Sequence, residues 1–214
     1  MNNITELLAK KEELHPELKP YIVYSEMKFP MLKHPLIFSL FYIEAENAML
    51  NMRYKVQKER LEKYLDIDDI TAYVFTYERP YRLSAFKEYI RLKKVTDDIY
   101  WSCLGSIWSD SENIWQEKRS WKHLLSSKRT QREFFMSPEE REIFSSLPET
   151  FTVYRGHQEQ NEDGYSYTLS YEKAKWFAER FKSKSSSVIE KVVNKSEVFA
   201  YLHDRNEQEI IIIK

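Results

Sequence analysis

The chain changes character at Pro148, and this change limits the folds open to it. The segment before Pro148 shows the apolar periodicity of amphipathic helices. After it come short runs rich in β-branched and aromatic residues, each bounded by polar turn residues: 151–155, 188–193, 198–202 and 210–213. Such runs are typical of strands. We therefore predict an α+β fold, with a helical region at residues 1–148 followed by a compact, β-rich core at residues 149–214.

One helix is predicted inside the β-rich core. It starts after the cap candidate Ser170 and continues to about Phe181, with Ala174 and Ala178 on its apolar face. The run at 210–213 consists of isoleucine alone. Because a strand covered on both faces reads as a continuous apolar run, this segment is predicted to be a central strand.

Helices are predicted through most of the first 148 residues. Pro35 suits the first turn of a helix, and the apolar and then charged stretch from there to about Leu65 predicts a long helix with a break inside it. Ser137, Pro138 and Glu140 form a helix start, with Ser137 as N-cap and Glu140 closing a capping box. The capping box predicts where a helix starts and indicates nothing about function.

Trp101, Trp108 and Trp115 recur every seven residues in the segment from 96 to about 125. This spacing predicts a stripe along one helical face, which favours a buried core over a ligand-stacking surface. Asp110 and Glu112 resemble a carboxylate pair for acid–base chemistry. We expect instead that these two residues lie in a solvent-exposed helix turn.

Composition excludes several classes of protein. Lys and Arg total 33 against 34 Asp and Glu among 214 residues, so no global basic field attracts nucleic acid, although a local basic patch stays open. The single cysteine, Cys103, cannot form an internal disulfide or a cysteine-based metal cluster. The first residues lack the pattern of a secretory signal, and no apolar run has the length of a membrane span. A soluble, cytoplasmic protein is expected.

Glycine is scarce, with three residues where about 7% is usual. Gly156 and Gly164 both fall in the β-rich core. Glycine is used where the backbone turns sharply or approaches another group closely. The sequence leaves open whether these two are turn residues or allow a ligand to approach.

Two glutamates stand at the head of the last strand. In a strand, residues two apart share a face, so Glu207 and Glu209 would lie together if the strand begins early enough, with Gln208 on the other side. Paired carboxylates can divide labour, one stabilising positive charge and the other orienting or deprotonating a second reactant. The alternative is an exposed edge that carries two glutamates for solubility.

Arg155 and a pair of hydroxyl residues add to this pattern. Arg155 ends an apolar strand and precedes Gly156, and an arginine fork suits a pyrophosphate or carboxylate. Ser166 and Thr168 lie two apart on one predicted strand face, where their hydroxyls could hold a ribose or orient a carboxylate. A solvated strand is the alternative for this pair.

In this order, the residues resemble the ADP-ribosyltransferase superfamily of the Arg-Ser-Glu type, which includes many bacterial toxins and phage enzymes. The matching motifs are Tyr154-Arg155-Gly156, Ser166-Tyr167-Thr168 followed by a helix, and Glu207-Gln208-Glu209 at the head of a strand. The resemblance covers roughly residues 150–214 and implies a mixed β core of that family. Tyr167 and Thr168 depart from the family's usual Ser-Thr-Ser motif, which leaves the role of Thr168 open.

The resemblance implies NAD as co-substrate and no metal. Glu209 would bind the ribose hydroxyl and stabilise the cation that forms when nicotinamide leaves, and Ser166 would position Glu209. Arg155 would hold the NAD phosphates or ribose, and backbone groups of Gly156 the nicotinamide amide. Glu207 would act on the acceptor.

Tyr167 and Thr168 complete the NAD-binding set that the resemblance implies, with Tyr154, Tyr165 or Tyr167 stacking on nicotinamide. His157 follows its strand and is expected at the surface.

The acceptor of ADP-ribose stays open between a protein arginine and a base of RNA or DNA. The segment 203–206 corresponds in place to the family's acceptor-contacting loop. A toxin, a phage-defence effector or a phage protein is expected, acting away from membranes and with an antitoxin or chaperone as its partner in the cell. The alternatives are an inactive binding protein of the same fold that acts through its helical region, and a plain NAD glycohydrolase.

Overall fold

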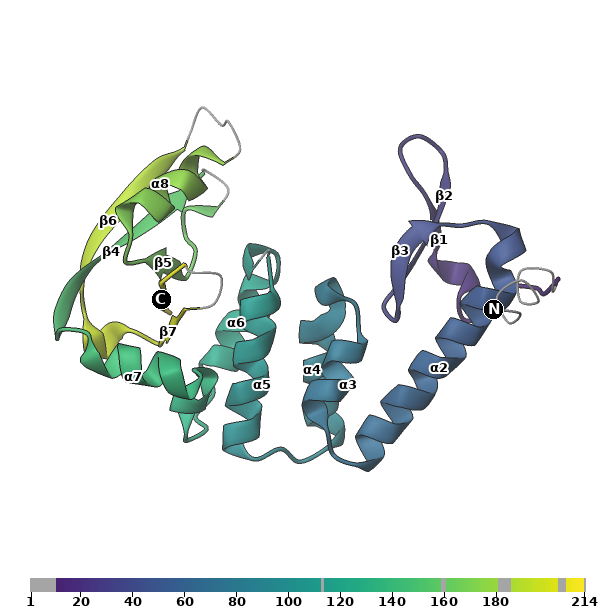
Figure 1. Ribbon diagram of the computed structural model, residues 1–214, viewed down its shortest axis with the longest axis horizontal. Coiled ribbons are helices and arrows are strands. Elements are labelled where there is room, and N and C mark those ends of the chain that lie inside the picture. Colours follow the sequence, from purple (N-terminus) through teal and green to yellow (C-terminus); the bar gives the residue numbers. More distant parts are fainter. Residues whose placement is uncertain (1–10, 113, 159–160, 181–185, 204–206, 214) are drawn as a thin grey trace. The chain divides into compact units, whose positions relative to one another are not determined.

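A computed structural model describes residues 11–112, 114–158, 161–180, 186–203 and 207–213. The chain divides into two compact units, Met1–Lys94 and Val95–Lys214. Both contain helices and antiparallel strands (Figure 1), so the predicted α+β class is confirmed. The division predicted between residues 148 and 149 falls inside the second unit, whose helices and strands belong to one compact body.

The first unit opens with a three-stranded antiparallel sheet, which corrects the prediction of a helical first region. Its strands are β1 (Ile22–Tyr24), β2 (Pro30–His34) and β3 (Ile37–Phe41), paired in that order. Leu32 and His34 are buried while Lys33 between them is exposed. This alternation has the period of a strand. The helix predicted from Pro35 therefore starts late, because its first residues pair as a hairpin.

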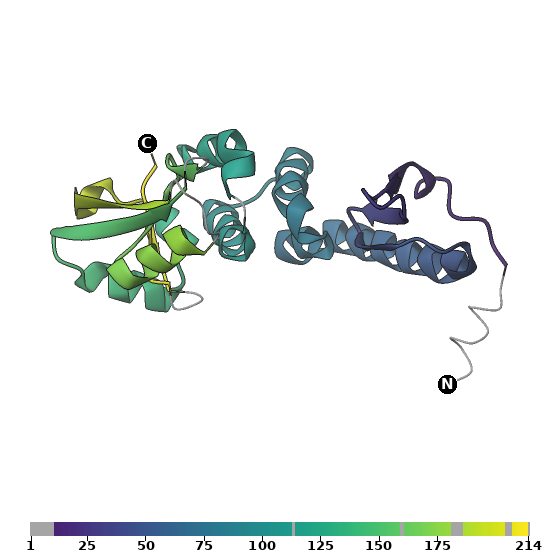
Figure 2. The same ribbon diagram turned by 90° about the horizontal axis from the view of Figure 1, so that it is seen from above.

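The rest of the first unit is helical. It comprises α2 (Asn47–Asp66), α3 (Ile70–Thr76) and α4 (Arg82–Leu92), with 3-10 turns η1 (Lys19–Tyr21), η2 (Glu44–Glu46) and η3 (Arg79–Tyr81). Figure 2 shows α2 as the long helix of this unit. A core of Leu and Ile side chains with Tyr54 joins the sheet to α2: Leu14, Leu18, Leu32, Leu36, Ile37, Leu50 and Tyr54.

The second unit contains a five-stranded antiparallel sheet in the order β6-β4-β5-β8-β7. The strands are β4 (Thr150–His157), β5 (Ser166–Thr168), β6 (Ser187–Asn194), β7 (Ala200–Leu202) and β8 (Glu209–Ile211). The strands predicted at 151–155, 188–193, 198–202 and 210–213 are present, and so is the strand predicted at Ser166 and Thr168. Ile210 and Ile211 are fully buried in β8 between β5 and β7, which confirms the predicted central strand.

Helices α7 (Pro138–Ser146) and α8 (Tyr171–Glu179) pack against strands of this sheet. The second unit also contains α5 (Asp97–Asp110) and α6 (Lys118–Leu125), with turns η4 (Ile114–Glu117), η5 (Arg132–Phe135) and η7 (Lys195–Glu197). Helix α8 lies along β4 and β6 (Figures 1 and 2). The predicted capping box is confirmed: the Ser137 hydroxyl accepts from the Glu140 N–H at 3.2 Å, and the Glu140 carboxylate accepts from the Ser137 N–H at 2.8 Å.

The tryptophan stripe is only partly core. Trp101 and Trp108 are buried on α5, and Trp108 packs edge-on against Trp121 at a centroid distance of 5.0 Å. Trp115 is 49% exposed, so the prediction that the stripe is buried is wrong for this residue. Helix α5 ends at Asp110, and the new direction of η4 takes Trp115 off the helical face.

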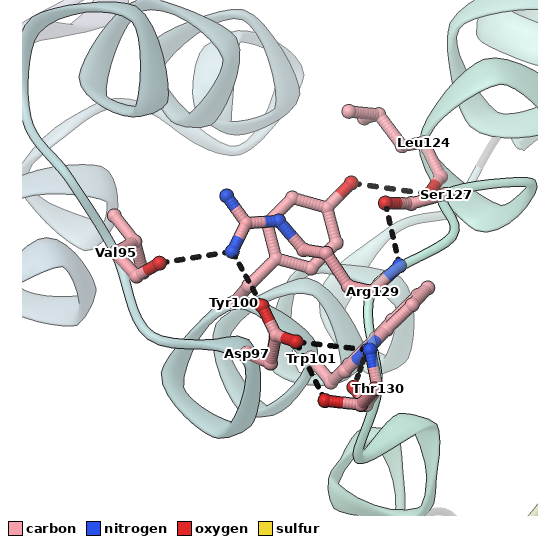
Figure 3. Close-up of polar contacts among 8 residues, drawn as sticks. All are labelled: Val95, Asp97, Tyr100, Trp101, Leu124, Ser127, Arg129 and Thr130. Carbon is pink, nitrogen blue, oxygen red and sulfur yellow. Dashed lines mark hydrogen bonds and ion pairs between the residues drawn. The ribbon is translucent and has the colours of Figure 1, made fainter.

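The N-terminus of α5 is tied to the loop after α6 (Figure 3). The Asp97 carboxylate accepts from Arg129 at 2.8 Å and from the Thr130 hydroxyl and N–H at 2.7 and 2.9 Å. Trp101 donates its indole N–H to the Thr130 carbonyl at 2.8 Å. These bonds, the Thr130 hydroxyl bond first and Arg129 as well, hold the pKa of Asp97 below its ordinary value of 3.8.

Asp97→Asn should lower the melting temperature at pH 7, because the amide removes the charge that Arg129 and Thr130 stabilise. A depressed pKa contributes stability that is present above the ordinary value and lost as pH falls through the folded-state value. The difference from wild type should therefore shrink below about pH 4. Thermal melts from pH 7 down to pH 2.5 measure it, with exposed Asp66→Asn as control. A difference that stays constant with pH would contradict this account.

Candidate functional site

One pocket of about 310 Å³ in the second unit is lined by residues from all three sequence motifs. Arg155, Ser166, Glu207 and Glu209 all line it, and so does Trp108 from α5. Ligand pockets for small molecules start at about this volume. The sheet order explains the convergence, because β4, β5 and β8 are consecutive neighbours in the sheet.

The Glu209 carboxylate is held by two donors. Glu209 is the first residue of β8, and its Oε1 accepts from the Ser166 hydroxyl on the neighbouring strand. The same oxygen accepts the indole N–H of Trp108 at 3.1 Å. Hydrogen bonds to a charged acceptor are stronger than those between neutral groups. The two donors therefore fix the orientation of this carboxylate at the pocket.

Trp108 is the site residue that sequence reasoning missed. It lies 101 positions from Glu209, outside the three motifs. Its membership of the tryptophan stripe was the available signal, but the stripe predicts burial and not a polar contact. Trp108 does both, since its ring is buried and its N–H reaches the pocket.

Glu207 reaches the pocket by a different backbone path from the predicted one. Strand β8 begins at Glu209, and Gln208 has a left-handed backbone with φ of 48°. The condition under which Glu207 and Glu209 would share a strand face, a strand that begins before Glu209, is therefore not met. The carbonyl of Glu207 accepts from the Thr168 hydroxyl at 2.7 Å, which ties this turn to β5.

Thr168 and Tyr167 are buried in β5. The Thr168 hydroxyl donates to the Glu207 carbonyl and accepts from the Ser170 N–H at 3.1 Å. It therefore joins β5, the start of α8 and the turn before β8. This bonding gives Thr168 a role in positioning Glu207, which the sequence left open.

Arg155 organises one wall of the pocket. Its guanidinium donates to the backbone carbonyls of Ser166, Asn161 and Glu162, the last two at 2.5 and 3.3 Å. Burial lowers the pKa of Arg155, and the nearby Glu209 carboxylate opposes that shift. Arginine cannot be deprotonated under ordinary conditions, so Arg155 remains a half-buried cation beside Glu209. It ties β4 to β5 and to the loop between them.

Gly156 and Gly164 are required by close packing. A β-carbon on Gly156 would lie 1.7 Å from the carbonyl oxygen of Ala174 in α8. One on Gly164 would lie 2.2 Å from the central carbon of the Arg155 guanidinium. Neither glycine has a positive φ. Gly156 thus lets α8 approach β4, and Gly164 makes room for Arg155.

Aromatic and basic residues complete the pocket: Trp115, Lys118, Tyr154, Tyr165, Phe177 and Arg180. The Lys118 ammonium lies 3.8 Å from the Asp163 carboxylate and 5.6 Å from the centre of the Tyr165 ring. Arg180 is exposed, with its guanidinium over the Trp176 ring. Apolar rings and cations together suit a ligand with flat rings and anionic groups.

The remaining predicted residues fall as follows. Glu112 is exposed and lines the pocket, whereas Asp110 is the last residue of α5. His157 is buried, contrary to expectation, and its Nε2 lies 2.8 Å from the Ser187 hydroxyl because β4 continues to this residue beside β6. Of the expected acceptor loop, residues 204–206 lie outside the described residues.

No family model, curated protein or solved structure matches the chain. Among the described residues, no group of three or more His, Cys, Asp or Glu side chains is placed to hold a metal ion. None of the helices in the described part of the chain combines the length and apolarity of a membrane span.

Gly156→Ala should destabilise the protein by about 1–3 kcal/mol, because the new methyl group would meet the backbone of α8 and overpacking has that cost. Gly164→Ala should cost less, since the group it meets is the far end of a flexible side chain. Urea denaturation compares the two variants. Wild-type stability in Gly156→Ala would show that α8 does not pack as described.

Proposed function

We propose that the second unit is an NAD-dependent mono-ADP-ribosyltransferase. The observation that supports this most is the Glu209 carboxylate, oriented by Ser166 and Trp108 in a pocket that Arg155 and Glu207 also line. The resemblance of the three motifs to the Arg-Ser-Glu type supplies the reaction. A carboxylate fixed in advance stabilises developing positive charge without reorganisation.

In the proposed reaction, the bond between the nicotinamide nitrogen and ribose C1′ breaks first. Its electron pair goes to the pyridinium ring, which leaves as neutral nicotinamide, and the positive charge moves to the ribose. Glu209 stabilises this cation. The acceptor then bonds to C1′ and loses a proton, for which Glu207 is the base. Because the charge is largest near bond cleavage, Glu209 acts mainly on the transition state.

We assign the parts of NAD to different residues of the pocket. The Arg155 guanidinium is engaged with three backbone carbonyls, so we assign it chiefly to holding the wall beside Glu209. Lys118 and the exposed Arg180 line the same pocket and are assigned to the diphosphate. Gly156, Tyr167 and Thr168 shape the site through packing and backbone contacts.

A macromolecular acceptor, a protein arginine or a nucleic-acid base, completes the proposal. Such an enzyme would act as a toxin, a phage-defence effector or a phage-encoded modifier in the cytoplasm, where the buried thiol Cys103 would stay reduced. An antitoxin or chaperone would be its partner. Water as acceptor would make the same site an NAD glycohydrolase, and labelling of lysate protein and RNA with tagged NAD separates these outcomes.

Glu209→Gln should abolish nicotinamide release from NAD and leave the fold intact. The amide oxygen still accepts from Ser166 and Trp108, but the charge that stabilises the ribose cation is gone. Nicotinamide release is measured by chromatography, with thermal melting as the folding control. Glu207→Gln is the matched variant, in which transfer to the acceptor should fall more than NAD cleavage. Full activity of Glu209→Gln would refute the proposed function.

Trp108→Phe should lower kcat for NAD cleavage by about tenfold or more, because a hydrogen bond to a charged group is worth about 1.5–3 kcal/mol. The phenyl ring keeps the aromatic packing and removes only the N–H. KM for NAD should change little, since Trp108 acts through Glu209. Trp121→Phe, which changes the neighbouring ring, is the control for packing. Equal losses of kcat in both variants would mean that Trp108 acts by packing alone.

A further inference from the structure

A second concavity, separate from the pocket of Glu209, lies in the same unit. It is a groove of about 570 Å³ formed between the loop after α6 and helix α7. Lys128, Arg129, Arg132 and Arg141 line it, and Glu133 is the acidic residue among the described residues of its lining. The whole chain has a net charge of −1, so this groove is a local concentration of positive charge.

Three of the four cations are available for a ligand. Arg129 is engaged with Asp97 at 2.8 Å. Within the described part of the chain, no carboxylate oxygen lies within ion-pair distance of Lys128, Arg132 or Arg141. Lys128 and Arg132 are exposed and Arg141 is half-buried. Unpaired cations on a surface attract phosphate groups, and arginine forks bind them in two-pronged fashion.

Aromatic rings lie beneath two of these cations, Arg132 and Arg141. The Arg132 guanidinium lies over Phe199 at 5.1 Å from the ring centre, and Arg141 lies over Phe134 at 4.7 Å. Phe144 also lines the groove. A guanidinium plane held over a ring presents a flat surface on which an unpaired base can stack. Its positive charge also attracts the neighbouring phosphates.

We propose that this groove binds single-stranded nucleic acid. A duplex hides its bases, so the guanidinium planes of Arg132 and Arg141 would have no base to stack on. An acidic peptide would satisfy the cations but would not use the flat surfaces. Phe199 immediately precedes β7, whose last residue Leu202 lines the pocket of Glu209. A nucleic acid bound at Phe199 would therefore lie about 10 Å from that pocket, measured along β7.

The proposal does not depend on NAD chemistry and is tested without NAD. The full chain is titrated against fluorescent 12-nucleotide single strands of RNA and DNA, with the matching duplex and a 12-residue poly-glutamate as competitors. Three phosphate contacts predict a log–log salt slope near −2, which corresponds to about a 20-fold loss of affinity between 50 and 200 mM salt. Stacking predicts that single strands bind more tightly than the duplex.

The variant Lys128→Gln/Arg132→Gln/Arg141→Gln should bind single strands at least tenfold more weakly. The matched control is Lys33→Gln/Lys63→Gln/Lys175→Gln, which removes the same charge from exposed lysines elsewhere and should bind as wild type. Melting curves exclude unfolding. Equal weakening in both variants, tighter binding of the duplex, or displacement by poly-glutamate at equal concentration would each overturn the proposal. Loss of NAD cleavage in Glu209→Gln leaves it untouched.

Discussion

The second unit depends on the contact between helix α5 and the sheet at Glu209. A carboxylate at a partly buried site is costly unless donors satisfy it. Trp108 from α5 and Ser166 from β5 both donate to one oxygen of Glu209. Trp108 is itself fixed by packing on Trp121 and Phe135. The hydrophobic core and the candidate site are therefore parts of one arrangement, and the helix that fills the core also orients the carboxylate.

Half-buried Arg155 supports another wall of the pocket in a comparable way. Its charge is compensated by backbone carbonyls of β5 and the loop before it, together with the field of Glu209. Such a group needs space free of side chains, which Gly164 provides. The other two glycines also allow a close approach. Gly105 lies against the backbone carbonyl of Phe135, and Gly156 lies against that of Ala174. The three glycines thus lie where other groups come closest to the backbone.

Net charge proved a poor guide to surface chemistry. The near balance of acidic and basic residues excludes a global field but says nothing about how charges cluster. Residues 128–132 and Arg141 come from a loop, a 3-10 turn and a helix, and the fold of the second unit gathers them along one groove. A short segment with a few basic residues has no distinctive sequence pattern, so the groove emerges only from the packing of these elements.

The sequence by itself determined the elements whose signals are local. The β-branched runs and the capping box at Ser137 depend on neighbouring residues, and the strands and the capping box are as predicted. Only the tertiary structure decided that Trp108 reaches Glu209 and that α8 requires Gly156. It also decided that β1–β3 precede the first long helix. These features depend on contacts between elements far apart in the chain, and local propensity does not encode which distant surfaces will meet.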